Sequence, residues 1–71
     1  MTKQDAIAAM IAGKKVTHKY FSREEYMTMD LSLLVITEDG YSRTLYEFFR
    51  YRKSHEWEDG YSEWIPLSNN L

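Results

Sequence analysis

The chain contains no cysteine, a single proline and only three glycines, and each scarcity excludes a class of site. Without cysteine there are no disulfides and no thiolate ligands for a structural zinc ion. The three scattered glycines cannot form a phosphate-cradling loop, and no serine lies in a Gly-x-Ser-x-Gly elbow. We therefore expect a protein that is not an enzyme and that has no cofactor.

Long apolar runs are also missing. No stretch approaches the roughly 20 apolar residues of a membrane-spanning helix. The first residues lack the charged-then-apolar order of a signal peptide. We expect a cytoplasmic protein that does not contact a membrane.

A chain of 71 residues predicts one domain, residues 1–71, with a thin core. A domain of this size buries only about 60% of the surface that its unfolded chain exposes. Aromatic side chains make up 15% of the chain, as six tyrosines, three phenylalanines and two tryptophans. These rings must supply much of the core, because no covalent cross-link can replace packing.

Periodicity and turn signals predict a small α+β domain in the order α-β-β-β-α-β, with two helices packed on a mostly antiparallel sheet of three to four strands. Pro66 cannot donate a ladder hydrogen bond, so the last strand should be an edge strand or end there. The expected helices are 3–12 and 45–52, and the expected strands are 16–21, 26–31, 33–37 and 61–65, with a brief extended segment at 41–43. The expected core is Ile7, Met10, Ile11, Val16, Val35, Leu45, Phe48 and Phe49.

The pentapeptide Glu-Asp-Gly-Tyr-Ser occurs twice, beginning at Glu38 and at Glu58. Asp-Gly is a strong hairpin signal because glycine reaches a positive φ without a Cβ clash. Gly40 and Gly60 should therefore have positive φ angles, and each copy should reverse the chain. Thr2, followed by Asp5 at the third position, can cap the first helix. Thr44 can cap the second helix, with Glu47 three residues on as its reciprocal partner.

Residues that could hold a metal ion or transfer a proton are few. His18 and His55 are the only histidines, and neither has a second ligand at metal-binding spacing. We expect His18 to be half-buried on a strand. The paired acids Glu24-Glu25, Glu38-Asp39 and Glu58-Asp59 lie at turns and do not have the spacing of a calcium loop. No metal site and no catalytic residue are predicted.

Charge is unevenly distributed, with +4 over residues 1–23 and −6 over residues 24–71. One basic cluster alternates with aromatic residues and could bind a phosphate or stack on a base. A second basic cluster lies on the second expected helix beside aromatic residues of the types enriched at binding hot spots. An acidic pI near 5.6 argues against duplex DNA as a partner. The candidate binding residues are Lys14, Lys15, Lys19 and Arg23 in the first cluster, and Tyr46, Arg50, Tyr51 and Trp57 in the second.

Residues 6–21, Ala-Ile-Ala-Ala-Met-Ile-Ala-Gly-Lys-Lys-Val-Thr-His-Lys-Tyr-Phe, resemble the opening of small phage and prophage proteins. A short helix ending in Gly-Lys-x-Val and followed by a basic strand is similar to the Thoeris anti-defence family of the second type. Tyr20-Phe21 stands where that family has Gly-Trp. The resemblance implies a phage-encoded, oligomeric protein that sequesters a cyclic ADP-ribose-like signal in the infected host cell without degrading it.

Two classes of function follow from these observations. The first is a non-enzymatic phage protein that counters a host defence, either by blocking a host protein or by sequestering a nucleotide signal. The alternative is a small nucleic-acid or nucleotide-phosphate binding module that uses the first basic cluster. A structural or interaction domain is a third interpretation. We also expect a symmetric dimer, because eleven aromatic rings are many for so small a core and no cross-link compensates.

Overall fold

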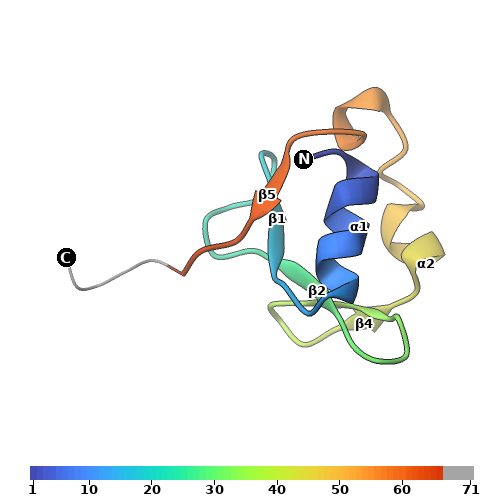
Figure 1. Cartoon of the computed structure of the whole chain (residues 1–71). Helices are drawn as coiled ribbons and strands as arrows, with labels where there is room; N and C mark the ends of the chain where they lie inside the picture. The colour runs from blue at the N-terminus through green and yellow to red at the C-terminus, as the bar shows by residue number, and fades with distance from the viewer. Residues whose placement is uncertain (67–71) are drawn as a thin grey trace.

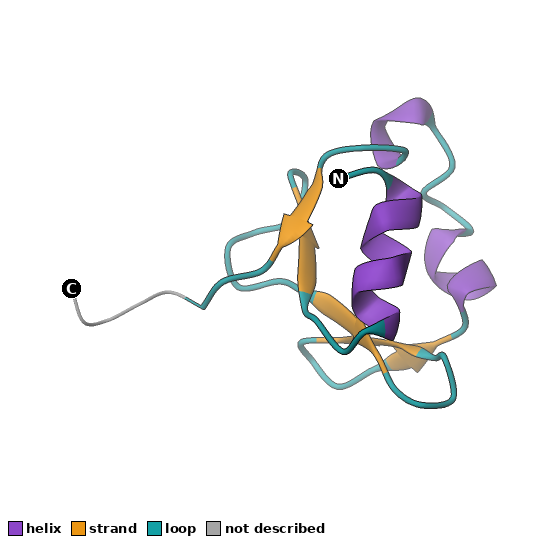
Figure 2. Ribbon diagram, in the orientation of Figure 1, coloured by secondary structure: helices purple, strands orange, loops and turns teal. Residues whose placement is uncertain are grey.

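Five short strands form one antiparallel sheet, and both helices lie on the same side of it (Figure 1, Figure 2). The computed structural model describes residues 1–66. The strand order across the sheet is β4-β3-β2-β1-β5. Along the chain the elements are α1 (Lys3–Ile11), β1 (Val16–His18), β2 (Met27–Met29), β3 (Val35–Thr37), β4 (Ser42–Arg43), α2 (Leu45–Phe49), the 3₁₀ turn η1 (His55–Trp57) and β5 (Tyr61–Glu63).

The predicted α+β class is confirmed, with one strand more than expected. The brief segment before α2 pairs with β3 as β4, with Arg43 opposite Val35 and Ser42 opposite Ile36. The last strand is an edge strand as predicted, since β5 pairs only with β1 among the described strands and ends at Glu63, before Pro66. No helix within residues 1–66 is long and apolar enough to span a membrane.

The strand expected over residues 16–21 ends three residues early. The backbone N–H of Phe21 donates to the carbonyl of His18 (2.8 Å), and the N–H of Tyr20 donates to Nδ1 of the His18 ring (3.1 Å). Both bonds turn the chain directly after His18. Tyr20 is consequently 56% exposed, whereas alternation along a strand would have buried it with Val16 and His18.

Both helices are capped by the predicted threonines, and each cap is a full capping box, which was predicted only for α2. In α1 the Thr2 hydroxyl accepts from the Asp5 N–H (3.1 Å), and the Asp5 carboxylate accepts from the Thr2 N–H (3.3 Å). Thr44 and Glu47 make the same two bonds at α2, at 3.0 and 2.9 Å. Helix α2 ends at Phe49, three residues before its predicted end, and its last residues Phe48 and Phe49 are buried.

The core contains five of the eight side chains expected there. Ile7 and Leu45 are half-buried at its edge, and burial of Ile11 was a wrong prediction, because this side chain is 58% exposed. Ala6 and Met10 define the inward face of α1, and one residue beyond Met10 rotates the side chain about 100° off that face. The buried residues are Ala6, Met10, Val16, His18, Met27, Met29, Val35, Phe48, Phe49 and Tyr61.

Both Asp-Gly turns have the predicted backbone. Gly40 has φ 88° and Gly60 has φ 91°. The surroundings of the two turns differ, because a Cβ on Gly40 would meet no atom within 4 Å. A Cβ on Gly60 would lie 3.1 Å from Nε2 of His18 and 3.1 Å from Cδ of Lys19. Glycine is therefore needed at position 60 for both its conformation and its size.

Candidate functional site

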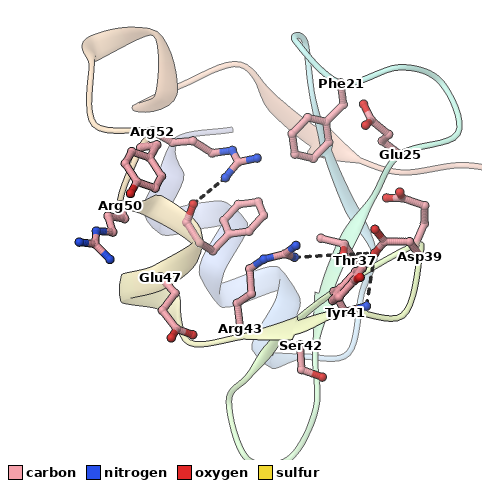
Figure 3. Close-up of a pocket in the computed structure, with 13 residues that line it drawn as sticks. Phe21, Glu25, Thr37, Asp39, Tyr41, Ser42, Arg43, Glu47, Arg50 and Arg52 are labelled. Carbon is pink, nitrogen blue, oxygen red and sulfur yellow. Dashed lines mark hydrogen bonds between the residues drawn. The ribbon is translucent and has the colours of Figure 1, made fainter.

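A cleft of about 660 Å³ lies between the β3–β4 turn and the C-terminal end of α2 (Figure 3). Phe21 and Glu25, from the connection between β1 and β2, line its third side. The cleft therefore combines residues from three separate parts of the chain. Figure 3 shows the side chains of Arg43 and Arg52 directed into it, whereas Arg50 points away.

Arg43 is held by a short hydrogen-bonded chain. Its Nη1 donates to the Thr37 hydroxyl (3.3 Å), and that hydroxyl donates to the carboxylate of Asp39. The same Asp39 oxygen accepts from the N–H of Tyr41 (3.3 Å). The hydrogen bonds from Thr37 and Tyr41 lower the pKa of the Asp39 carboxyl, so Asp39 stays ionised and anchors the arginine.

Arg52 lies between two aromatic rings. Its guanidinium carbon is 4.2 Å from the ring centroid of Phe48 and 5.4 Å from that of Trp57. Nη1 donates to the carbonyl oxygen of Phe48 (2.7 Å). Burial is the main cause that lowers the pKa of Arg52, and repulsion by Arg43 is the second. Both arginines line the same cleft.

Carboxylates line the cleft, but none forms an ion pair with these two arginines. Among residues 1–66 no carboxylate oxygen lies within 4.0 Å of either guanidinium. Glu25 instead accepts from the Ser22 N–H (2.6 Å), and Glu38 accepts from the Tyr26 N–H (3.1 Å). The Glu25 bond closes a turn, and the Glu38 bond joins the end of β3 to the start of β2.

Only some residues of the second predicted cluster are exposed at the surface. Tyr46 and Tyr51 are 67% and 82% exposed, and Arg50 lies over the Tyr51 ring at 5.5 Å. Trp57 was also expected at this surface, and in a loop. It belongs to η1 and is half-buried, with its indole stacked on His18 at 4.1 Å. Trp57 therefore packs against the edge of the core.

The first predicted cluster surrounds Trp64. Lys15 Nζ lies 4.7 Å from the Tyr26 ring and 5.5 Å from the Trp64 ring, and the Trp64 indole donates to the carbonyl of Arg23 (2.9 Å). Lys19 and Arg23 line a hollow of about 330 Å³ beside Trp64. Lys14 is exposed at the end of α1, where its carbonyl accepts from the hydroxyl of Thr28.

The structure does not bring the two predicted clusters together. The first lies at the β1–β5 edge of the sheet, whereas α2 and the residues directly after it, which carry Tyr46, Arg50 and Tyr51, lie on the other side of α1 (Figure 1). Trp57 is apart from these three on η1, where its indole contacts the rings of His18 and Tyr20. Sequence analysis also omitted Arg43 and Arg52 from the site residues. Helical spacing carried a signal for Arg52, because it follows the buried Phe48 by four residues. No local pattern distinguished Arg43.

His18 is 2% exposed, more deeply buried than predicted. Its Nδ1 accepts from the Tyr20 N–H, and its Nε2 lies 2.8 Å from the carbonyl oxygen of Asp59 and 3.1 Å from that of Glu56. This arrangement requires the neutral ring with the proton on Nε2. Within residues 1–66 no group of three or more histidine or acidic side chains is placed to hold a metal ion.

Comparison of the chain with protein-family models, with curated proteins and with solved structures found no match.

Proposed function

We propose that this protein acts by non-covalent binding and counters a host defence during phage infection, by blocking a host protein or by sequestering a nucleotide signal. The likeness of residues 6–21 to the Thoeris anti-defence proteins of the second type motivates the biological setting. The proposed binding face is the outer side of α2 with the adjoining residues, namely Tyr46, Arg50 and Tyr51.

The observation that carries this proposal is the contrast between the two faces of α2. Phe48 and Phe49 fix the helix to the core, so their neighbours are held outward on a rigid support. Tyr46 and Tyr51 are mostly exposed although no packing requires two tyrosines there. Tyrosine and arginine are enriched at binding hot spots because they offer large contact areas with few rotatable bonds.

Capture from host lysate tests this proposal. Immobilised protein should retain a specific host component, identified by mass spectrometry of proteins and of extracted nucleotides. The double variant Tyr46→Ala/Tyr51→Ala should lose at least about tenfold of that binding, as expected when hot-spot side chains are truncated. Leu31→Ala is the matched control, because Leu31 is a fully exposed side chain outside the proposed face. Equal retention by all three proteins would overturn the proposal.

The alternative proposal is a nucleic-acid or nucleotide-phosphate binding module at the first cluster. Its support is the grouping of Lys15 with the rings of Tyr26 and Trp64, next to the hollow lined by Lys19 and Arg23. Single-stranded DNA binding that falls steeply with added salt, and that Lys15→Gln weakens, would favour this alternative. Binding to the double variant of α2 should then be unchanged.

We further propose that the protein forms a symmetric dimer. The groove between α1 and α2 supports this, since it is an opening of about 340 Å³ with mostly apolar walls. Its lining residues are Ile7, Leu45, Tyr46 and Phe49, with Lys3 and Lys53. Ile11 is exposed on the same helix as Ile7. Burying such apolar surface against a second copy is favourable, and isologous pairing requires only one kind of face.

A further inference from the structure

The cleft at the end of α2 contains two arginines, and within residues 1–66 neither has a carboxylate in direct contact. Repulsion by Arg43 contributes to the lowered pKa of Arg52. Neither guanidinium has a carboxylate oxygen within 4.0 Å among residues 1–66. Two like charges held in this way are less stable than the same charges with an anion between them.

Contacts within the protein also fix the position of each guanidinium without a ligand. Thr37 and Asp39 hold Arg43, whereas the Phe48 carbonyl and the rings of Phe48 and Trp57 hold Arg52. Each of these arginines makes one hydrogen bond to the described protein, out of five N–H groups. The remaining donors are available in a planar fork, which matches the geometry of phosphate oxygens.

We propose that Arg43 and Arg52 form a clamp for the phosphate group of a small phosphate monoester. The cleft volume of about 660 Å³ exceeds that of a phosphate alone, so an organic group fits beside it. Phe21, Tyr41 and Phe48 line the same space and favour a flat or apolar group. Arg50 and Tyr51 of the proposed partner face also line this cleft. The clamp itself depends on Arg43 and Arg52, which are not part of that face, so the inference stands if the face binds no partner.

The carboxylates of the cleft restrict the ligand to low charge. Glu25, Glu38, Asp39 and Glu47 line the walls, and like charges on a ligand would be repelled by them. In the proposed clamp a single phosphate group lies between the two arginines, whereas a polyphosphate or a nucleic-acid backbone would extend along the acidic wall. We expect binding to weaken as further phosphates are added to the ligand.

Thermal unfolding with inorganic phosphate and with phenyl phosphate tests the clamp. At constant ionic strength, a tenfold excess over Kd should raise Tm by roughly 5–10 °C for a domain of this size. Arg43→Gln should weaken binding by about tenfold or more, which is the expected loss for a charge-assisted hydrogen bond. Lys53→Gln removes the same charge from an exposed position and should leave the shift unchanged. Equal shifts with chloride, or an unaltered Kd in Arg43→Gln, would overturn the proposal.

Arg52 requires a milder variant because it packs between two rings. Arg52→Lys keeps the charge and most of the packing but loses the fork, and it should weaken phosphate binding while remaining folded. Amide NMR locates the site independently of stability. Shifts should concentrate at Thr37, Arg43 and Arg52, and shifts confined to Lys15 and Arg23 would refute the clamp. Tighter binding of phenyl phosphate than of inorganic phosphate would indicate an aromatic monoester, and equal binding would indicate free phosphate as the ligand.

Discussion

The imidazole of His18 stacks on the indole of Trp57, with the ring centroids 4.1 Å apart and the ring planes inclined by 26°. This contact joins the first strand to the 3₁₀ turn before the last strand. The His18 ring also forms hydrogen bonds to the backbone of Tyr20, Glu56 and Asp59. These bonds connect the same segments as the ring stacking does. A buried histidine with these bonds connects three segments of a thin core.

His18→Phe should destabilise the protein although it preserves an aromatic ring. The variant leaves the Tyr20 N–H and two carbonyl oxygens without their partner, which should cost about 1–3 kcal/mol. Urea denaturation measures this loss. His55→Phe is the control, because the His55 side chain is 92% exposed and its replacement should change the unfolding free energy by less than about 0.5 kcal/mol. Equal stability of the two variants would contradict a structural role for His18.

Alanine should be tolerated less well at Gly60 than at Gly40. Gly40→Ala meets only the strain of a positive φ, and should cost about 1 kcal/mol. Gly60→Ala adds a close contact with the buried His18 ring, so its loss should be larger by about 1 kcal/mol or more. Thermal unfolding of both variants provides the comparison. An unchanged Tm in both would contradict the turn geometry.

Phe48 should be one of the most sensitive core positions. Its side chain is 2% exposed, meets Phe49 edge to face at 5.0 Å, and supports the guanidinium of Arg52. Phe48→Ala should cost about 3–5 kcal/mol, which is comparable with the whole stability of a domain this small. The control is Tyr51→Ala, because Tyr51 is exposed, and this variant should lower the free energy of unfolding by less than about 0.5 kcal/mol. Circular dichroism melting distinguishes the two, and a native melting curve for Phe48→Ala would contradict this packing.

Stability should fall at alkaline pH through Tyr61. Burial raises the pKa of its phenol to about 12, and the hydroxyl donates to the Trp57 carbonyl (2.6 Å). Because the unfolded pKa is about 10, the stabilisation is fully present below pH 10 and is lost as the pH rises through 12. The total loss should be about 2–3 kcal/mol.

Denaturation at several pH values between 7 and 12 measures this dependence. Tyr61→Phe should be less stable at neutral pH by about 1 kcal/mol, yet should show a flatter alkaline decline. Tyr51→Phe is the control, since Tyr51 is exposed and its variant should retain the full decline. A decline of the same size in Tyr61→Phe would assign the alkaline loss to other groups.

Sedimentation tests the proposed dimer. A mass near twice 8.5 kDa at micromolar concentration is expected, and Ile11→Lys should shift the protein toward monomer by placing a charge at the exposed end of α1. Added salt should have little effect if apolar contacts dominate, and should weaken the dimer if opposite charges do. A mass of 8.5 kDa at every concentration would exclude self-association.

Several features of this protein follow from the sequence alone, because their causes are local. The Thr–x–x–acid patterns begin both helices, and the two Asp-Gly turns have their positive φ, since a few neighbouring residues determine each geometry. The alternation of apolar and polar residues likewise predicted β2 and β3, although both strands are shorter than expected.

Only the tertiary structure determines which side chains that are distant in the sequence lie close together. The end of β1 depends on a ring nitrogen of His18 that bonds the following backbone, and the burial of that ring depends on Trp57, 39 residues later. Arg43 precedes α2 and Arg52 follows it in the sequence, and both line one cleft because α2 turns the chain back over β4. Contacts between distant segments depend on how the whole chain folds, and no local pattern of residue types encodes them.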